Sequence, residues 1–343
     1  MMEDKIGGTL EDSSSVFHVR NCISLKAFSA LTRIIRYSGY SGDFPATQES
    51  FWILHRDIQE ALRNNRPEWI YNDELGVEIN GVRKAVTVDM RNTQFIGADL
   101  DVAHFRNGYE PDILFCIDQF VPNDGVYIDI GANWGYFPVY LSARPGFFGH
   151  CLAIEPAPRA SRDLEQVVAS LDLGEMITVH PVAMSDHAGK VRISDELWTG
   201  NNTIFTVENE ASSDADEVEC IALDDLLESD TFSRVNLIKI DVEGAEDAVL
   251  RGAENTIRKF NPVIIFENWV DQSEEKTLAP FQELLRLSLG YEFFIMELRE
   301  TSQFTFSYRL IKLDLGRRKS YDDRINVIAL PPEKLELKLP ANA

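Results

Sequence analysis

The pattern of apolar and polar residues divides the chain into two parts. In the first part, apolar residues recur at helical spacing from Leu25 to Ile35 and from Phe51 to Leu62, and they alternate with polar residues around Asn80-Gly81. These patterns predict two amphipathic helices followed by a β-hairpin, because Asn-Gly is the strongest short hairpin signal. We expect residues 1–20, which are mostly polar, to be mobile, and residues 21–108 to form an extension on the substrate side.

Short apolar runs and helical patterns alternate through the second part, residues 109–330. Five runs lie near residues 126–130, 151–154, 177–183, 235–241 and 262–266, and three later ones lie near 293–298, 304–313 and 325–329. The alternation predicts an α/β fold with a doubly wound, mostly parallel sheet, and we expect the last strands to form an antiparallel edge. Residues 331–343 are expected to be a peripheral tail.

The first of these strands ends in a short glycine-containing stretch that indicates a ligand-binding turn. Asp129 stands at the carboxyl end of the strand, and Gly131, Asn133 and Gly135 are residue types that accept a positive φ. A dinucleotide fingerprint needs a third glycine where this chain has Tyr136, so a pyrophosphate is disfavoured. We expect a ligand with an adenosine end and no phosphates, a description that S-adenosylmethionine fits.

The ends of the next two strands complete the predicted cofactor site. Glu155-Pro156 lies roughly 20 residues beyond the glycines, where a carboxylate accepts both ribose hydroxyls of a bound nucleoside. Ser185 and Asp186 follow the third strand and are expected either to flank the adenine or to form an ordinary turn. The predicted cofactor-binding residues are Asp129, Gly131, Ala132, Asn133, Gly135, Tyr136, Glu155, Pro156, Ala183, Ser185 and Asp241.

Acidic residues at two further strand ends are the candidates for catalysis. Strand alternation places Lys239, Asp241 and Glu243 on one side, and Glu267 follows the next strand. Because the carboxyl ends of strands in an open α/β sheet line the ligand crevice, we expect these groups to converge there. A carboxylate among them could take the proton of an alcohol, with Lys239 holding the acceptor. Helix-dipole stabilisation explains Glu243 equally well.

Three other residues are predicted to meet the second substrate, and a metal ion is an alternative for the acids. Asn201 and Asn202 lie in a polar insertion, and Trp269 follows Glu267 closely. Grouped carboxylates could hold Mg²⁺ or another hard cation. We do not favour a metal, because no histidine accompanies them.

Composition narrows the possible partners and the compartment. The chain has 343 residues, is 44% hydrophobic and carries a net charge of −23, which disfavours nucleic acid and anionic lipid as partners. Its four cysteines show no CxxC spacing, so we expect reduced core residues. No charged-then-apolar leader and no run of membrane-spanning length is found, which predicts a soluble, cytoplasmic protein. A homo-oligomer is compatible with these features.

Several motifs resemble the FkbM family of S-adenosylmethionine-dependent methyltransferases. They are Tyr109-Glu-Pro, Asp129-Ile-Gly-Ala-Asn-Trp-Gly, Ile154-Glu-Pro, Val182-Ala-Met-Ser-Asp, Leu223-Asp-Asp-Leu and Ile238-Lys-Ile-Asp-Val-Glu-Gly-Ala-Glu, followed by Pro262 and Glu267. The resemblance covers about residues 109–298. It implies a class I methyltransferase sheet and O-methylation of a hydroxyl, usually on a sugar or natural product. The alternatives are a nicotinamide-dependent oxidoreductase, which would need the missing glycine, and a non-catalytic scaffold with the same fold.

Overall fold

The computed structural model describes most of the second part of the chain and short pieces of the first. The described residues are 15–18, 23–25, 73–79, 81–88, 94, 109–194, 204–205, 215–228, 232–270, 273–302, 305–322 and 324–335. The two predicted helices between Leu25 and Leu62 lie outside these ranges, apart from their first residue.

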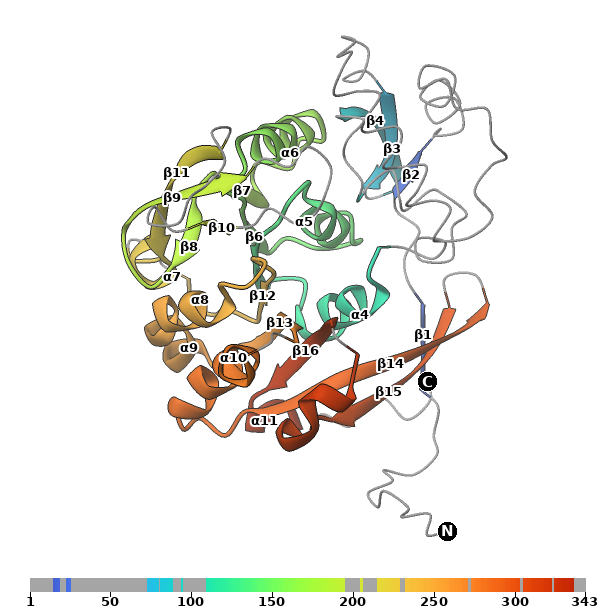
Figure 1. Cartoon of the computed structure of the whole chain (residues 1–343). Helices are drawn as coiled ribbons and strands as arrows, with labels where there is room; N and C mark the ends of the chain where they lie inside the picture. Colours follow the sequence, from blue (N-terminus) through green and yellow to red (C-terminus); the bar gives the residue numbers. More distant parts are fainter. Residues whose placement is uncertain are drawn as a thin grey trace, which may run out of the picture.

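A nine-stranded sheet forms the centre of the fold, in the order β1-β15-β14-β16-β13-β12-β5-β6-β7 (Figure 1). Its parallel part consists of β5 (Val126–Ile130), β6 (His150–Ile154), β7 (Ile177–His180), β12 (Leu237–Ile240) and β13 (Val263–Trp269). Its antiparallel part consists of β16 (Arg324–Leu330), β14 (Glu292–Ser302), β15 (Thr305–Lys312) and β1 (Ser15–His18). The predicted doubly wound sheet with an antiparallel edge is confirmed.

Helices cover both faces of the parallel strands. One face packs against α4 (Pro111–Phe120), α5 (Tyr136–Ser142) and α6 (Pro158–Ser170), and the other against α8 (Glu246–Gly252), α9 (Glu254–Phe260) and α10 (Glu274–Arg286). Three further short helices are α7 (Leu223–Leu226), η2 (Leu315–Ser320) and α11 (Pro332–Leu335). Within β5, Tyr127 belongs to the first core and Ile128 to the second, which explains why this strand is apolar on both sides.

Three expectations about the strands were wrong. The run 177–183 is two strands, because Pro181 interrupts it and the chain then enters a second sheet as β8 (Ala183–Ser185), beside β11 (Ala215–Ala222), β9 (Gly189–Ser194) and β10 (Ile204–Phe205). Part of residues 1–20, expected to be mobile, is strand β1, which pairs with the otherwise open edge of β15. The first residue of the predicted helix at Leu25 ends strand β2 (Ile23–Leu25) instead.

The predicted hairpin in the extension is confirmed. Strands β3 (Asp73–Ile79) and β4 (Val82–Val88) pair antiparallel, with β2 on the other side of β3, and Gly81 turns between them at φ +77°. Lys84 of β4 donates to the backbone oxygen of Leu171 at 2.7 Å and pairs with Asp172, so the hairpin contacts the end of α6.

Two general expectations can be compared with the described residues. Cys116, Cys151 and Cys220 are free and buried, as expected, whereas Cys22 lies outside the described ranges. Within those ranges, no helix combines the length and apolar character needed to cross a membrane.

The sheet reverses its winding between β5 and β12, and the loops that follow these two strands touch. A Cβ atom added to Gly131 would lie 1.8 Å from the backbone oxygen of Asp241. The glycine therefore allows the two strand ends to meet at the switch point, where open α/β sheets bind ligands.

The contact predicts a large loss of stability in Gly131→Ala. The substitution adds a clash with Asp241 to the strain of a left-handed backbone at φ +76°, and the strain alone costs about 1–2 kcal/mol. Gly81→Ala is the matched control, because Gly81 has φ +77° and no atom within 4 Å of an added Cβ. Urea unfolding should show a clearly larger loss for Gly131→Ala; equal losses would mean that the contact is unimportant.

Candidate active site

The turn after β5 has the predicted left-handed backbone, but its glycines serve the protein's own packing. Gly131, Asn133 and Gly135 have φ values of +76°, +50° and +84°. A Cβ on Gly135 would lie 2.1 Å from Cδ1 of Leu164, so this glycine lets α5 approach α6. The turn is tight because Asp241, just after β12, and Leu164 of α6 pack closely against its glycines.

Four backbone N–H groups of this turn have partners within the protein. Those of Gly131 and Ala132 donate to the backbone oxygen of Ile154 at 2.9 and 3.0 Å, and that of Gly135 donates to the oxygen of Ala132 at 2.9 Å. The N–H of Asn133 donates to Oε2 of Glu155 at 2.7 Å. These groups are therefore not available to bind phosphate.

Lys239 is buried where the ends of β5 and β12 meet. Its Nζ donates to the backbone oxygen of Gly131 at 3.0 Å and lies 3.3 Å from both Oδ1 of Asp129 and Oδ2 of Asp241. Burial alone would lower the pKa of Lys239, but the two carboxylates raise it above its usual value, so the ammonium stays charged. Lys239 thus joins the two strand ends.

Asp129 is fully buried beside this ammonium. Burial raises its pKa to about 6, and the charge of Lys239 opposes the rise. Neither of its carboxylate oxygens makes a hydrogen bond with a described residue. A buried carboxylate that depends on one cation makes that cation structurally essential.

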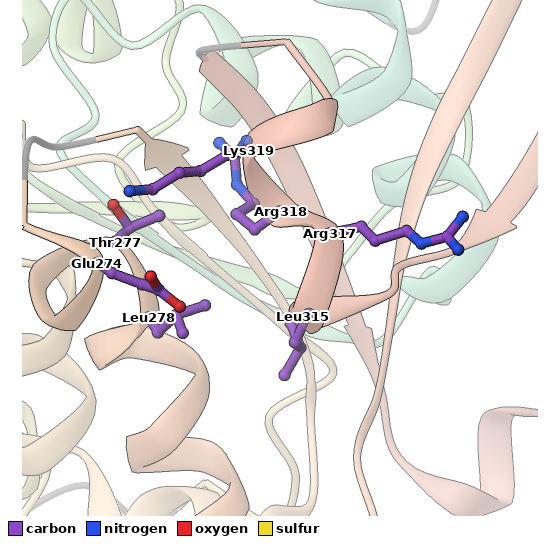
Figure 2. A pocket seen from close by; sticks show the side chains of 8 residues that line it. Glu274, Thr277, Leu278, Leu315, Arg317, Arg318 and Lys319 are labelled. Carbon is purple, nitrogen blue, oxygen red and sulfur yellow. The ribbon is translucent and has the colours of Figure 1, made fainter.

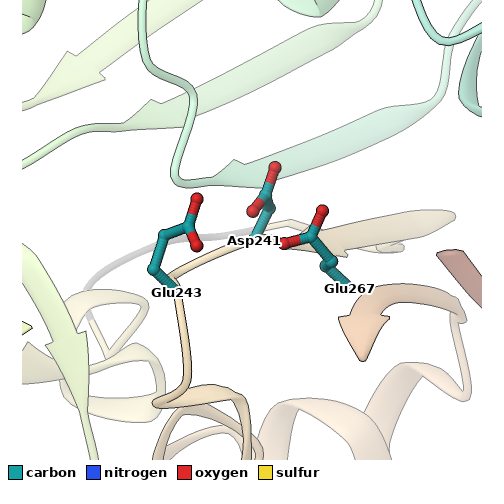
Figure 3. A group of neighbouring side chains, drawn as sticks. All are labelled: Asp241, Glu243 and Glu267. Carbon is teal, nitrogen blue, oxygen red and sulfur yellow. The ribbon is translucent and has the colours of Figure 1, made fainter. Parts of the chain in front are cut away.

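Three predicted catalytic acids come together at the carboxyl ends of β12 and β13. Asp241, Glu243 and Glu267 each offer a carboxylate oxygen, and these oxygens lie within 4.8 Å of one another (Figure 3). Glu243 stands at φ +56° in a turn fastened by Glu246, whose Oε1 accepts from the N–H groups of Val242 and Gly244 at 3.3 and 3.1 Å. Burial and the charge of Asp241 raise the pKa of Glu243 to about 8.

Two side chains at the rim of the site hold the carboxylate of Glu267 in position. Its Oε1 accepts a hydrogen bond from Nε of Arg324, and its Oε2 accepts from Nε1 of Trp269 at 2.6 Å. The guanidinium of Arg324 lies over the Trp269 ring, 4.9 Å from its centre. These two residues are directly opposite each other in the pairing of β13 with β16.

Sequence reasoning assigned no role in the site to three residues, Tyr109, Glu110 and Gln94. Glu110 precedes α4 at φ +45°, and burial together with Asp241 raises its pKa to about 8. The N–H of Tyr109 donates to the hydroxyl of Tyr136 at 3.4 Å, and the N–H of Tyr136 donates to Oε1 of the buried Gln94 at 3.3 Å. The Tyr-Glu-Pro motif was a signal for the first two residues, because it is one of the FkbM-like motifs, but we assigned neither residue a role in the site.

Comparison with known families identifies this constellation. Residues 129–293 match the model of the methyltransferase FkbM domain, a segment that contains the turn, the buried lysine and the three clustered acids. We refer to this matched segment, just under half of the chain, as the FkbM domain. The family supports S-adenosylmethionine as the cofactor, as the sequence predicted, and the central sheet is that of a class I methyltransferase.

Characterised relatives share about half of the chain. It is 28% identical over 158 residues to the hexuronic acid methyltransferase AglP of Haloferax volcanii, covering 46% of this chain and 61% of that protein. It is 27% identical over 184 residues to the 2-O-methyltransferase NoeI of Sinorhizobium fredii, covering 49% of this chain and 73% of that protein. The crystal structure of methyltransferase FkbM from Methylobacillus flagellatus is 14% identical, with a TM-score of 0.38, over 88% of this chain and 59% of that one. The chain thus spans less than two thirds of AglP.

Glu155 lies next to the glycine turn of the FkbM domain, where the sequence placed a ribose ligand. It is 4% exposed, and its two oxygens accept from the N–H groups of Asn133 at 2.7 Å and Ala157 at 2.8 Å. Burial raises its pKa to about 7. Pro156, which follows it, is half-buried. Glu155 therefore shapes the turn, and its role toward a ribose stays a prediction.

The remaining predicted residues of the FkbM domain are less closely tied to the site. Ala183 and Ser185 belong to β8 of the second sheet, and the hydroxyl of Ser185 lies 3.4 Å from both Asp186 and His187. Asp186 is paired with Arg251 of α8 at 2.8 Å, a contact that serves packing. The adenine role of Ala183 and Ser185 stays a prediction, and Asn201 and Asn202 lie outside the described residues.

A cleft of about 720 Å³ lies behind the end of β13, between α10 and η2 (Figure 2). Arg318 on its wall is buried, and it donates from Nε to Oδ1 of Asn268 at 2.5 Å and from a terminal nitrogen to the backbone oxygen of Asn268 at 2.6 Å. Asn268 in turn donates to the backbone oxygen of Thr277. The cleft wall thus fixes the segment that carries Glu267 and Trp269.

The buried ion group predicts a strong effect of Lys239→Met on stability. Removing the ammonium leaves Asp129 buried without its cation, which costs about 3–5 kcal/mol in comparable cases. Lys190→Met is the control, since the pair of Lys190 with Glu217 is exposed and should contribute little to stability. Urea unfolding measures both. Adding Asp129→Asn should restore part of the loss in Lys239→Met; no recovery would show that the loss is not caused by an unpaired charge.

Proposed function

We propose that the chain transfers a methyl group from S-adenosylmethionine to a hydroxyl of a small acceptor, a sugar or a natural product. The main support for this proposal is the cluster of Asp241, Glu243 and Glu267 beside the buried Lys239, at the switch point of the FkbM domain. The names of the matched relatives, a hexuronic acid methyltransferase and a 2-O-methyltransferase, support a sugar acceptor.

The residues around the β5 turn fit a nucleoside ligand without phosphates. Four of the turn's N–H groups are engaged within the protein, so they offer no cradle for a pyrophosphate, and this weighs against a nicotinamide-dependent oxidoreductase. Glu155, one strand over, keeps lone pairs that ribose hydroxyls can use. S-adenosylmethionine would supply an electrophilic methyl group on a sulfonium.

The protein's own contribution is to orient the acceptor and to remove its proton. Asp241 is paired with Lys239, and both oxygens of Glu267 are engaged by Arg324 and Trp269. Glu243 is half-exposed, and no hydrogen bond of its carboxylate to a described residue is found. We therefore assign the general base to Glu243, with Asp241 and Lys239 orienting the reactants. A base with a pKa near the working pH contributes about 10²–10⁴-fold.

A hard cation between the three acids is the alternative role for the cluster. Glu267, however, is already occupied by the guanidinium of Arg324, and the positive charge of that group would repel a second cation. This occupancy favours the metal-free assignment. A non-catalytic scaffold is the remaining alternative. Cofactor binding and turnover, measured together, distinguish such a scaffold from an enzyme.

The ribose assignment predicts weaker cofactor-product binding in Glu155→Ala. The variant loses one or two hydrogen bonds to a charged acceptor, each worth about 1.5–3 kcal/mol, and its turn is less well held. Calorimetry with S-adenosylhomocysteine measures the affinity, and Glu165→Ala, on the exposed side of α6, is the control. Unchanged affinity in Glu155→Ala would refute the ribose role. Tight binding of NAD by the wild type would favour the oxidoreductase.

The base assignment predicts two opposite pH trends that Glu243→Gln should remove. Folding raises the pKa of Glu243 from 4.5 to about 8, so protonation of this residue stabilises the fold. That contribution to stability is fully present below pH 4.5 and is lost as the pH rises through 8. Turnover should rise over the upper part of the same range, because the base must be deprotonated. Glu243→Gln should lose turnover and gain stability relative to the wild type above pH 8. If Glu110→Gln removes the rise in turnover instead, Glu110 is the base.

A further inference from the structure

Arg324 lies at the rim of the acid cluster, on a strand outside the matched FkbM segment. It is the first residue of β16, directly opposite Trp269 of β13. Its Nε donates to Glu267, and its guanidinium covers part of the Trp269 ring at 4.9 Å. The position of the guanidinium is thus fixed from two sides.

Most of the hydrogen-bonding capacity of Arg324 is unused. A guanidinium carries five N–H donors in a planar fork, and the contact with Glu267 uses the one on Nε. The two terminal nitrogens make no hydrogen bond with a described residue, and 43% of the side chain is exposed. Lys239, the other cation of the cluster, is only 2% exposed. A ligand beside the acid cluster can therefore reach the charge of Arg324 but not that of Lys239.

Trp269 presents an apolar surface next to these free donors. Its ring nitrogen is satisfied by Glu267 at 2.6 Å, which holds the indole in place, while 39% of the residue stays exposed. A rigid, partly exposed aromatic ring beside hydrogen-bonding groups suits a ring-shaped polar ligand such as a sugar. One carboxylate, that of Glu267, thus positions both an apolar surface and a cation.

We propose that Arg324 and Trp269 form an acceptor subsite for an acidic sugar, whose carboxylate pairs with the terminal nitrogens of Arg324. The planar fork matches a carboxylate in two parallel hydrogen bonds, which an ammonium cannot do. The carboxylate of Asp241 disfavours an anion deeper among the acids, so the acid group stays at the rim and the opposite, hydroxyl-bearing side turns toward Glu243. The inference rests on the proposed function, and it deepens that function by naming the acceptor class.

Such a subsite would supply positioning through a part of the acceptor that does not react. Binding energy from a remote group can be used to hold the reacting oxygen in line with the methyl group. The loss of Arg324 should therefore affect acidic acceptors selectively, whereas a residue that only supported Glu267 would affect acidic and neutral acceptors alike.

The test compares two glycosides that differ only in the acid group, methyl β-glucuronide and methyl β-glucoside. Saturation-transfer NMR titrations on the full chain with S-adenosylhomocysteine give both affinities. The wild type should bind the glucuronide on the order of 10- to 100-fold more tightly, the value of a bidentate charged pair. Arg324→Gln should abolish this preference by weakening the glucuronide far more than the glucoside, and Arg324→Lys, which keeps the charge without the fork, should restore part of it.

Arg309→Gln is the matched control, because Arg309 forms an exposed pair with Glu297 on β14 and should leave the preference intact. Equal binding of both glycosides by the wild type, or of neither at millimolar concentration, overturns the subsite without using any variant. An equal loss of both in Arg324→Gln also overturns it and leaves Arg324 as a support for Glu267. Failure to bind S-adenosylhomocysteine would instead contradict the proposed function, while the preference for the acidic glycoside can still be measured without cofactor.

Discussion

The ammonium of Lys239 is the contact on which the site depends. It is buried between the ends of β5 and β12 and meets the backbone oxygen of Gly131 and the carboxylates of Asp129 and Asp241 within 3.3 Å. A buried charge is tolerated only when it is paired and hydrogen-bonded, so these groups depend on one another. Because Gly131 lies against the backbone of Asp241 without room for a Cβ atom, the two strand ends are also fixed sterically. Both constraints place the acids of β12 at a defined distance from the turn of β5.

The acid cluster is stable because protons and two cations offset its charge. Burial raises the pKa values of Glu243 and Glu110 to about 8, so both are largely protonated near neutral pH. Lys239 and Arg324 balance charges on Asp129, Asp241 and Glu267. The cost of gathering carboxyl groups is thereby kept low, and the same proton affinity makes the two glutamates suited to acid–base chemistry.

The parts of the structure that depend on local sequence were predictable, and those that depend on tertiary pairing were not. Strand β5 and its turn were predictable, because burial on both faces and positive φ values leave a clear pattern in the residue types. The split at Pro181 was missed because two strands in different sheets can be continuous in sequence. The position of Arg324 opposite Trp269 was missed because the register of two strands far apart in the chain leaves no local signal. Gln94 escaped notice for the same reason, since its partner is a backbone N–H in the turn.

The division between predictable and unpredictable residues coincides with a division of the site. The turn, Lys239 and the three clustered acids all lie within residues 129–293, the segment that matches the FkbM family. Gln94, Glu110 and Arg324 lie outside it: Gln94 accepts from the N–H of Tyr136, Glu110 interacts with the charge of Asp241, and Arg324 pairs with Glu267. Family similarity therefore accounts for the strand ends that would hold a methyl donor. The proposed acceptor subsite lies on an element outside this segment, so it would allow substrate specificity to change while the parallel strands and their buried lysine stay the same.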